Sequence, residues 1–196
     1  MFRFNLIDPH FLPHVGCDVE FSLPHGECLV FVGENGVGKS TLAEKIHDHF
    51  ESTSVFIPQP PLHHFYDRKL SVFKEILLSH HQQTLDADKF SQLWKQFGMN
   101  EKEDRPLQGL SGGENQALKL VVGLSTMKSL LILDEPTLNL DAVRKDYLKN
   151  FIVSSMKTGK SFIIIEHDLP WLPTGHSVIQ LAQKDKMLVK ESQWTT

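Results

Sequence analysis

Residues 33–41 read Gly33-Glu34-Asn35-Gly36-Val37-Gly38-Lys39-Ser40-Thr41 and match the phosphate-binding pattern G-x-x-x-x-G-K-[ST] at every specified position. The glycines allow the backbone to wrap closely around a polyphosphate, so that successive N–H groups point at its anionic oxygens. Lys39 supplies positive charge to the β- and γ-phosphates, and the Ser40 hydroxyl can bind Mg²⁺. A glycine-rich turn that merely starts a helix would need neither side chain, so the pattern predicts nucleotide binding.

The segments on either side of this loop fit the strand before it and the helix after it that a phosphate-binding loop requires. Residues 28–32 form an apolar run typical of a buried strand, and residues 41–46 have a helical pattern. Farther out, strands are expected at residues 2–6, 18–23, 54–57, 130–133, 161–165, 178–181 and 187–190. Helices are expected from Ser111 and from about Ala142, and residues 70–98 have a polar helical pattern. This alternation predicts an α/β fold with a mostly parallel sheet and an inserted helical block.

Length and composition restrict the kind of protein. A chain of 196 residues can bury a full core but is short for two domains, so a single domain over residues 1–196 is expected. The formal net charge of −4 argues against a nucleic-acid partner held through its phosphates. Cys17 and Cys28 are the only cysteines, which favours a reducing compartment over a disulfide framework. The apolar runs are of strand length and the first residues lack a secretion-signal pattern, so we expect a cytoplasmic location.

A second chemical motif is Leu130-Leu131-Ile132-Leu133-Asp134-Glu135-Pro136. An apolar strand buried on both faces can deliver the carboxylates at its end to a phosphate site. Asp134 would hold Mg²⁺ through its water shell, and Glu135 would polarise an attacking water. Alone, the pattern is equally typical of a strand that runs into a turn. The phosphate loop upstream makes the catalytic interpretation the better one.

The segment Leu110-Ser111-Gly112-Gly113-Glu114-Asn115-Gln116 lies between these motifs. Ser111 and Glu114 form a capping-box pattern, which marks the start of a helix. The cap does not explain Gly112 and Gly113, because glycine costs about 1 kcal/mol relative to alanine in a helix. Two bare backbone positions at a helix N-terminus predict the approach of a second anion.

Residues 33–41, 110–116 and 130–136, in this order, strongly resemble the nucleotide-binding domain of ATP-binding cassette (ABC) proteins, and the resemblance covers nearly the whole chain. Gln59 resembles the Q-loop glutamine, Asp141 in Leu140-Asp141 the D-loop aspartate, and His167 the switch histidine. The resemblance implies a P-loop NTPase (RecA-like) core at residues 1–60 and 106–196. It also implies a small N-terminal antiparallel β part and a helical subdomain at about residues 61–105 that extends into the signature helix.

The resemblance further implies a head-to-tail dimer in which two ATP molecules are sandwiched, each between the phosphate loop of one subunit and the signature segment of the other. Water would attack the γ-phosphate in line, with Glu135 as base, His167 on the γ-phosphate and Gln59 sensing the metal. The expected catalytic residues are Glu135, His167, Gln59 and Lys39. The expected Mg²⁺ ligands are Ser40, Gln59 and Asp134. The residues expected to bind ATP are Gly33, Glu34, Asn35, Gly36, Val37, Gly38, Lys39, Ser40, Thr41, Ser111, Gly112, Gly113, Glu114, Asp141 and Phe11.

The chain departs from the family pattern in three places. The interval from Lys39 to Gln59 is short, which predicts a trimmed antiparallel β part. Phe11 is then the candidate that stacks on adenine, although a core phenylalanine explains it equally well. Ala117 replaces a common basic residue, and Asn139 gives a D-loop like that of soluble branches of the family.

The leading functional hypothesis is the ATPase subunit of a transporter, a homodimer or paired ABC subunit that lies on the cytoplasmic face of the membrane against an integral membrane partner. Residues 60–65 would line the groove for that partner, although an ordinary surface loop is an equal interpretation. The alternative is a soluble ABC ATPase of ribosome or chromosome type. Such proteins usually join two cassettes or insert long coiled coils, and the sequence shows neither. A small-molecule kinase would leave Ser111–Glu114 and His167 unexplained.

Overall fold

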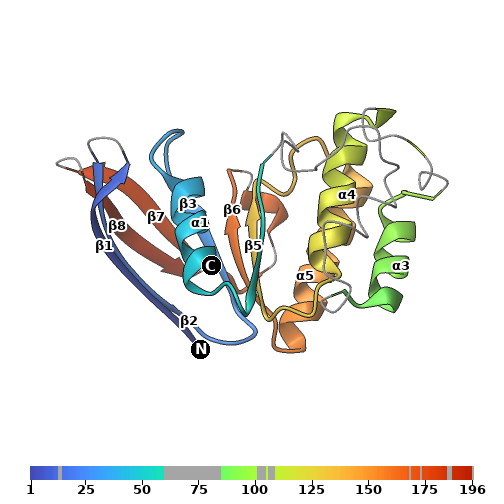
Figure 1. Ribbon diagram of the computed structural model, residues 1–196, viewed down its shortest axis with the longest axis horizontal. Coiled ribbons are helices and arrows are strands. Elements are labelled where there is room, and N and C mark those ends of the chain that lie inside the picture. Colours follow the sequence, from blue (N-terminus) through green and yellow to red (C-terminus); the bar gives the residue numbers. More distant parts are fainter. Residues whose placement is uncertain are drawn as a thin grey trace.

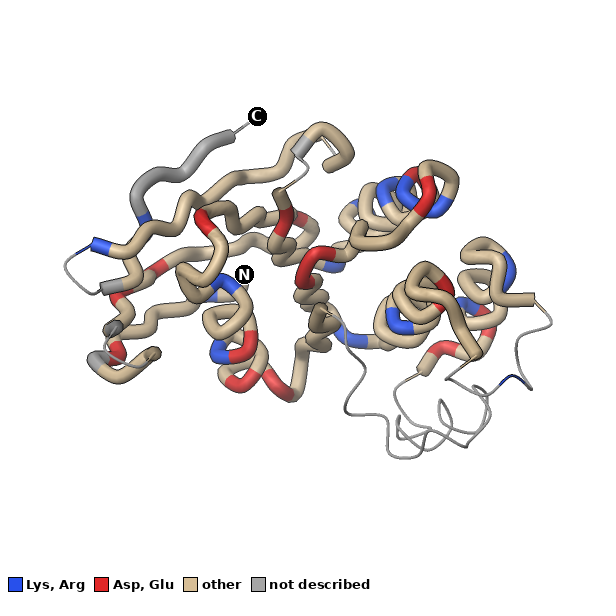
Figure 2. Tube along the Cα trace, turned by 90° about the horizontal axis from the view of Figure 1, so that it is seen from above, with Lys and Arg blue, Asp and Glu red and all other residues tan. Residues whose placement is uncertain are grey.

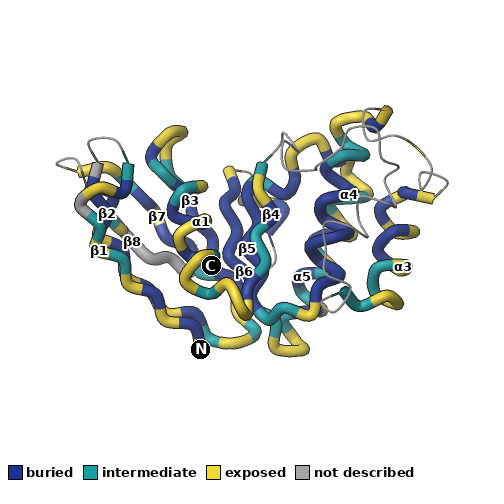
Figure 3. The backbone as a smooth tube through the Cα atoms, in the orientation of Figure 1, coloured by how far each residue is buried: buried dark blue, intermediate teal, exposed yellow. Residues whose placement is uncertain are grey.

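Four parallel strands form the centre of the fold. The computed structural model describes residues 1–12, 15–59, 85–100, 105, 109–167, 169–172, 174–184 and 187–195. The central strands are β3 (Cys28–Val32), β6 (Ser161–Ile165), β5 (Leu130–Asp134) and β4 (Ser54–Ile57), adjacent in that order and paired in parallel. Every residue of β5 and β6 is buried (Figure 3). Strands covered on both faces require apolar side chains throughout, which explains their uninterrupted hydrophobic sequences.

Beyond β3, the sheet continues as antiparallel pairs of longer strands. β1 (Phe2–Leu12) pairs with β2 (Val15–Leu23), and β7 (Ser177–Lys184) pairs with β8 (Met187–Thr195). The full strand order among the described residues is β1-β2-β8-β7-β3-β6-β5-β4. β7 joins β3 in parallel, and β2 joins β8 in parallel. The antiparallel part is therefore continuous with the central sheet (Figure 1).

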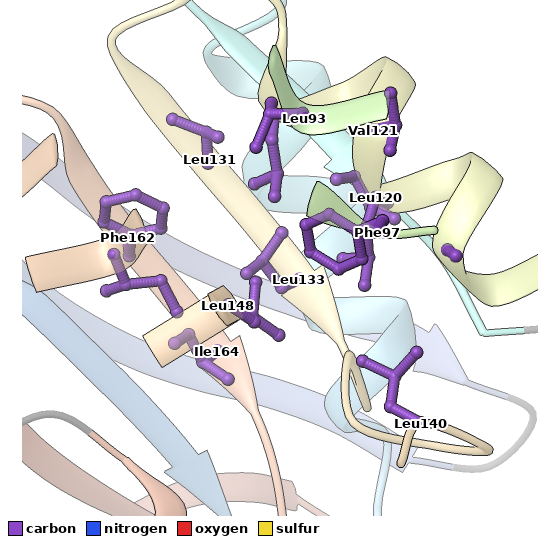
Figure 4. Packing of buried hydrophobic residues seen from close by; sticks show 14 of the residues in the cluster. Leu93, Phe97, Leu120, Val121, Leu131, Leu133, Leu140, Leu148, Phe162 and Ile164 are labelled. Carbon is purple, nitrogen blue, oxygen red and sulfur yellow. The ribbon is translucent and has the colours of Figure 1, made fainter. Parts of the chain in front are cut away.

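The helices cover opposite faces of this sheet. α1 (Lys39–His49) shares one hydrophobic cluster with β1 and β2. The helices α3 (Ala87–Gln96), α4 (Gly112–Leu124) and α5 (Ala142–Lys157) pack together on the other face. A short 3₁₀ helix, η2 (Leu169–Trp171), follows β6. Figure 4 shows the second cluster, where Leu93 and Phe97 of α3 approach Leu120 of α4.

The close fit of α4 against β4 depends on one glycine. A Cβ placed on Gly123 would lie 2.2 Å from Cδ1 of Ile57, a distance that no relaxed contact allows. The small residue therefore lets the middle of α4 lie directly on the strand. This contact brings α4 close to the end of β4, where Gln59 follows.

These observations confirm the predicted α/β class, the mostly parallel sheet and each predicted strand. The helical block is only partly described, since residues 60–84, 101–104 and 106–108 lie outside the described residues, and with them the proposed partner groove at residues 60–65. The domain boundaries therefore stay predictions. Among the described helices, none combines the length and apolar character needed to cross a bilayer. Basic and acidic residues are interspersed over the described helices and strands (Figure 2).

Candidate functional site

The candidate site lies along one edge of the sheet, where four neighbouring parallel strands end. The register pairs Phe31 of β3 and Asp134 of β5 with Ile165 of β6, and Ile57 of β4 with Leu133. Parallel strands have their carboxyl ends at the same edge, and ligands of open α/β sheets bind there. The residues that follow these strands are the phosphate loop, Gln59, the pair Asp134 and Glu135, and His167. The topology thus brings together side chains that are far apart in the sequence.

The phosphate loop has the backbone that its glycines permit. Gly36 and Gly38 have φ values of 78° and 109°, which side-chain-bearing residues rarely adopt. The N-terminus of α1 begins at Gly38 with no side-chain cap. A Cβ on Gly36 would meet nothing within 4 Å, so the loop presents open backbone. The exposed backbone at Gly36 and the positive end of α1 fit a polyphosphate.

Lys39 lies across this loop. Its Nζ donates to the carbonyl oxygens of Gly33 and Glu34 at 2.8 and 2.9 Å. Burial lowers the pKa of Lys39, whereas the carboxylates of Glu135 and Asp134 raise it. A compact cation on a flexible stem can exchange these carbonyls for phosphate oxygens. The position therefore fits the predicted contact with the β- and γ-phosphates.

Asp134 provides the test of whether Mg²⁺ fits this site. Its carboxylate is buried, and Oδ1 has no hydrogen-bond partner among the described residues. Burial raises the pKa of Asp134, and a side-chain hydrogen bond with Ser40 opposes that rise. A buried carboxylate with one oxygen free beside a hydroxyl is a hard oxygen donor set, which Mg²⁺ prefers. Ser40 and Asp134 therefore fit the metal. Gln59 is half-buried two residues beyond the end of the neighbouring strand β4, and its contact with the metal stays a prediction.

Glu135 and His167 meet at the ends of β5 and β6. Nε2 of His167 lies 3.5 Å from Oε1 of Glu135, and Glu135 N donates to Ile165 O at 2.9 Å. Glu135 has a φ of 45°, an unusual value for a residue with a side chain. Strained backbone of this kind clusters at functional sites. The strand ends thus hold a carboxylate and an imidazole side by side, where an acid–base role requires them.

Glu166 is a site residue that the sequence analysis missed. Its carboxylate is buried and accepts hydrogen bonds from the Thr137 hydroxyl at 2.7 Å and from the His167 N–H at 2.8 Å. It therefore links the loop after β5 to the loop after β6. A charged residue directly after an apolar strand was a visible signal, but only His167 in that segment was assigned a role.

The signature segment has the predicted capping box, and packing gives one of its glycines a second explanation. Ser111 Oγ accepts from Glu114 N at 3.2 Å, and Ser111 N donates to Glu114 Oε2 at 2.8 Å, which completes the capping box. A Cβ on Gly113 would lie 2.7 Å from the backbone oxygen of Asn139. Gly113 is bare because the loop after β5 packs against it within the same chain. A Cβ on Gly112 would meet only ordinary contacts, 3.5 Å from the Asn139 side chain, so packing does not explain this glycine. Binding of a second anion by the backbone of Gly112 and Gly113 stays a prediction.

Asp141 has a local structural role. Its carboxylate caps α5 by accepting from Arg144 N at 2.9 Å, and it pairs with Arg144 Nη1 at 3.1 Å. Arg144 Nε also donates to Phe97 O, at the C-terminus of α3, at 2.9 Å. Arg144, which the sequence analysis missed, thus ties α3 to the start of α5. The expected contact of Asp141 with nucleotide stays a prediction.

Phe11 lies beside the phosphate loop and within the core. It is 5% exposed and belongs to the cluster of β1, β2 and α1. A Cβ on Gly38 would be 2.9 Å from its ring, so the ring packs against the loop. This burial favours the core interpretation, and adenine stacking stays a prediction.

Two buried polar side chains of α4 reach the loops of the site, and neither was expected. Gln116 Nε2 donates to Pro136 O at 3.0 Å, and Lys119 Nζ donates to Pro58 O at 3.2 Å. Burial lowers the pKa of Lys119 to about 8, and the Asp134 carboxylate opposes the shift. Ala117 packs in the apolar cluster between them. The signature helix is therefore connected to the residues beside Glu135 and Gln59.

The two glycine-bearing helix starts of the molecule lie apart. α1 and α4 pack on opposite faces of the sheet, and Figures 1 and 2 both show strands between them. Contact of Ser111 with a nucleotide bound to another molecule stays a prediction.

Comparisons with known proteins agree with these motifs. A family profile described as ABC transporter matches residues 17–138. The chain is 33% identical over 171 residues to the erythromycin resistance ATP-binding protein MsrA of Staphylococcus epidermidis, covering 82% of this chain but 34% of that protein. It is 30% identical over 174 residues to the zinc import ATP-binding protein ZnuC of Psychrobacter arcticus, covering 84% of this chain and 70% of that protein. The chain thus spans about a third of the length of one of its first relatives.

The fold also resembles that of solved proteins. A protein described as the ATP binding subunit of an ABC transporter superimposes with a TM-score of 0.73, at 20% identity, over 91% of this chain and 82% of that one. At this identity the likeness shows a shared fold. It confirms the predicted P-loop architecture.

Proposed function

Because this chain belongs to the ABC transporter family, we propose that it is the ATP-hydrolysing subunit of a transporter, acting with a separate integral membrane partner at the cytoplasmic face of the membrane. Membership bears out the predicted family and the ATPase class that goes with it. The relative ZnuC is named for zinc import, and that name supports a transport role without indicating the cargo of this chain.

One observation carries the proposal: adjacent strand ends hold Lys39, Asp134, Glu135 and His167 at one edge of the sheet. We assign Lys39 and the backbone of residues 33–38 to the phosphates of ATP. When bound between Ser40, Asp134 and Gln59, Mg²⁺ would neutralise phosphate charge. These roles follow from charge, because a lysine and backbone N–H groups attract phosphate oxygens, whereas a carboxylate attracts Mg²⁺.

Glu135 and His167 carry the hydrolytic step. The oxygen of a water attacks the γ-phosphorus, the bond from that phosphorus to the β,γ-bridging oxygen breaks, and the products are ADP and phosphate. The Glu135 carboxylate takes the proton of the water. His167, whose Nε2 lies 3.5 Å from Glu135 Oε1, contacts the γ-phosphate. Glu166 fixes the His167 backbone through its hydrogen bond to the His167 N–H.

Ser111, Gly112 and Gly113 complete the site of a second copy in this proposal. The capping box already occupies part of the N-terminus of α4, so this segment is a weaker anion site than the phosphate loop. We therefore propose that two chains associate head to tail in ATP, each signature segment closing on the partner's nucleotide. Release of phosphate would open the dimer and pass the change to the membrane partner.

The test of the enzymatic part is Glu135→Gln, which keeps the shape and removes the base. The expected loss in kcat is about 10³-fold, within the range of a general base, while ATP binding persists and an ATP-bound dimer accumulates. Phosphate release and size-exclusion chromatography with light scattering measure both effects. Unchanged turnover would rule out the role of Glu135.

The transport part is tested by affinity purification of the full-length protein from membranes solubilised in mild detergent. An integral membrane protein is expected to co-purify in stoichiometric amount. Recovery of the protein with ribosomes, and without a membrane partner, would instead favour the soluble class of ABC ATPase.

A further inference from the structure

The face of α4 that points to the sheet carries two buried polar residues in the midst of an apolar helix. Gln116 is 0% exposed and Lys119 is 6% exposed, whereas their buried helix neighbours from Ala117 to Leu124 are otherwise apolar or glycine. The two positions are three residues apart and therefore lie on the same face of the helix. Packing alone would be served by apolar side chains here.

Each of these side chains holds a carbonyl next to a site residue. Gln116 donates to Pro136 O, one residue after Glu135, and Lys119 donates to Pro58 O, one residue before Gln59. Both carbonyls belong to backbone that leaves the sheet at the end of a strand. One helix face is thus bonded to the two loops that would present the catalytic carboxylate and the metal-sensing amide.

A lysine is costly at the position of Lys119. A buried ammonium loses its hydration, and replacing a buried charge by an apolar side chain of similar volume is often neutral or stabilising. Part of the cost is offset, since the Asp134 carboxylate favours the charged amine. The hydrogen bond from Lys119 to Pro58 O lies on the Gln59 side of the site, directly before Gln59 in the chain.

We propose, on the basis of the ATPase function above, that Lys119 is a positioning residue for Gln59, which holds the Pro58 carbonyl so that the Gln59 amide is presented to the Mg²⁺ side of the ATP site. Because Lys119 is on the signature helix, it also joins that helix to the Q-loop through a single hydrogen bond. A shift of α4 is then transmitted to Gln59.

A double-mutant cycle tests this role. Lys119→Met removes the amine and keeps a side chain of similar length, while Gln59→Ala removes the group to be positioned. We expect Lys119→Met to lower kcat about tenfold, with KM for ATP changed by less than about twofold, as for a small misplacement of a catalytic group. In the Gln59→Ala background the same change should alter kcat by less than about twofold.

A second readout is independent of turnover. Mg²⁺ is titrated into the protein with saturating ATP, and the rise in Tm gives the Mg²⁺ concentration at half effect. Lys119→Met should raise this midpoint about threefold, roughly the loss of a weak contact, and should not raise it in the Gln59→Ala background. Lys119→Arg keeps a donor and should restore the midpoint.

Lys160→Met is the matched control. Lys160 also donates to a backbone carbonyl, Thr126 O at 2.7 Å, and burial lowers its pKa to about 8 as well. It is remote from the strand ends, so its loss should leave kcat and the Mg²⁺ midpoint unchanged. If Lys119→Met does not fold, Lys119→Gln serves in the same cycle.

The positioning role would be overturned if Lys119→Met changed kcat and the Mg²⁺ midpoint equally in the wild-type and Gln59→Ala backgrounds. A lowered Mg²⁺ midpoint in Lys119→Met would overturn it as well. A wild-type protein that binds Mg²⁺ and ATP but does not hydrolyse ATP would overturn the proposed function instead, and the midpoints would still decide on Lys119. A Tm that does not respond to Mg²⁺ and ATP would overturn both.

Discussion

The N-terminus of α1 and the N-terminus of α4 both carry glycines, but for different physical reasons. Gly36 and Gly38 have positive φ values, and the start of α1 has no side-chain cap. Gly112 and Gly113 are helical, and the start of α4 is closed by its own capping box. The first helix start is therefore open to a polyphosphate without help. The second is a weaker anion site, and in the function proposed above it adds contacts to a phosphate that another molecule holds.

The largest expected effect comes from a substitution at the first helix start, the N-terminus of α1. Lys39→Ala should weaken ATP binding about 100-fold, as expected for loss of a charge-assisted contact with phosphate. Calorimetry with ATP measures the change. Lys45→Ala, an exposed lysine of the same helix, is the control and should leave the affinity unaltered. Retained affinity in Lys39→Ala would argue against the assignment of the loop.

A change at the second helix start should separate binding from association. Ser111→Arg places bulk and positive charge where the partner's nucleotide must approach, so ATP-dependent dimers should be lost while each chain binds ATP normally. Sedimentation velocity with and without ATP gives the dimer fraction. Ser111→Ala loses the same cap without the bulk, at a cost of about 1 kcal/mol in stability, and should still dimerise. A persistent ATP-dependent dimer of Ser111→Arg would contradict the trans contact.

The two adjacent glycines of α4 offer a finer distinction. Gly113→Ala brings a methyl group within 2.7 Å of Asn139 O and should destabilise the fold by about 1–2 kcal/mol. Gly112→Ala meets ordinary contacts at 3.5 Å and should be neutral or stabilise by up to about 1 kcal/mol through helix propensity. Urea unfolding of both monomers measures the difference. Equal stabilities would show that the approach of Asn139 does not demand glycine.

A further expected effect concerns pH and the Lys119 amine on α4. Burial lowers the pKa of Lys119 from 10.5 to about 8. Between these values the unfolded chain holds the proton that the folded chain has lost, so this group makes the unfolding free energy rise with pH, by at most about 1.4 kcal/mol per unit. The unfolding free energy of the wild type minus that of Lys119→Met should therefore increase from pH 8 to pH 10. Parallel pH curves for the two proteins would contradict the shift.

The same comparison shows what the sequence could predict. The capping box, the apolar strands and the strand and helix that flank the phosphate loop are local patterns, and the structure confirms each of them. Contacts between distant segments carry no local signal. Lys119 and Pro58 are far apart in the chain, and no residue pattern near Lys119 indicates its hydrogen bond to Pro58 O.

Gly113 shows that one sequence feature can have an explanation that only the structure reveals. Its departure from helix propensity was visible, but the close approach of Asn139 depends on tertiary packing. Glu166 was visible as an acid at the end of a strand, whereas its bond to Thr137 required the pairing of β5 with β6. Sequence patterns thus predicted which segments form the site, and the structure supplied the contacts that support them.

The most direct measurement mixes two variants that are each defective alone. Lys39→Ala lacks the phosphate lysine and Ser111→Arg lacks the closing segment, but a mixed dimer contains one complete pocket, with Lys39 from one chain and Ser111 from the other. We predict that mixing the two restores ATP-dependent association, and with it hydrolysis above either variant alone. A mixture that remains monomeric and inactive in ATP would contradict a site shared between two chains.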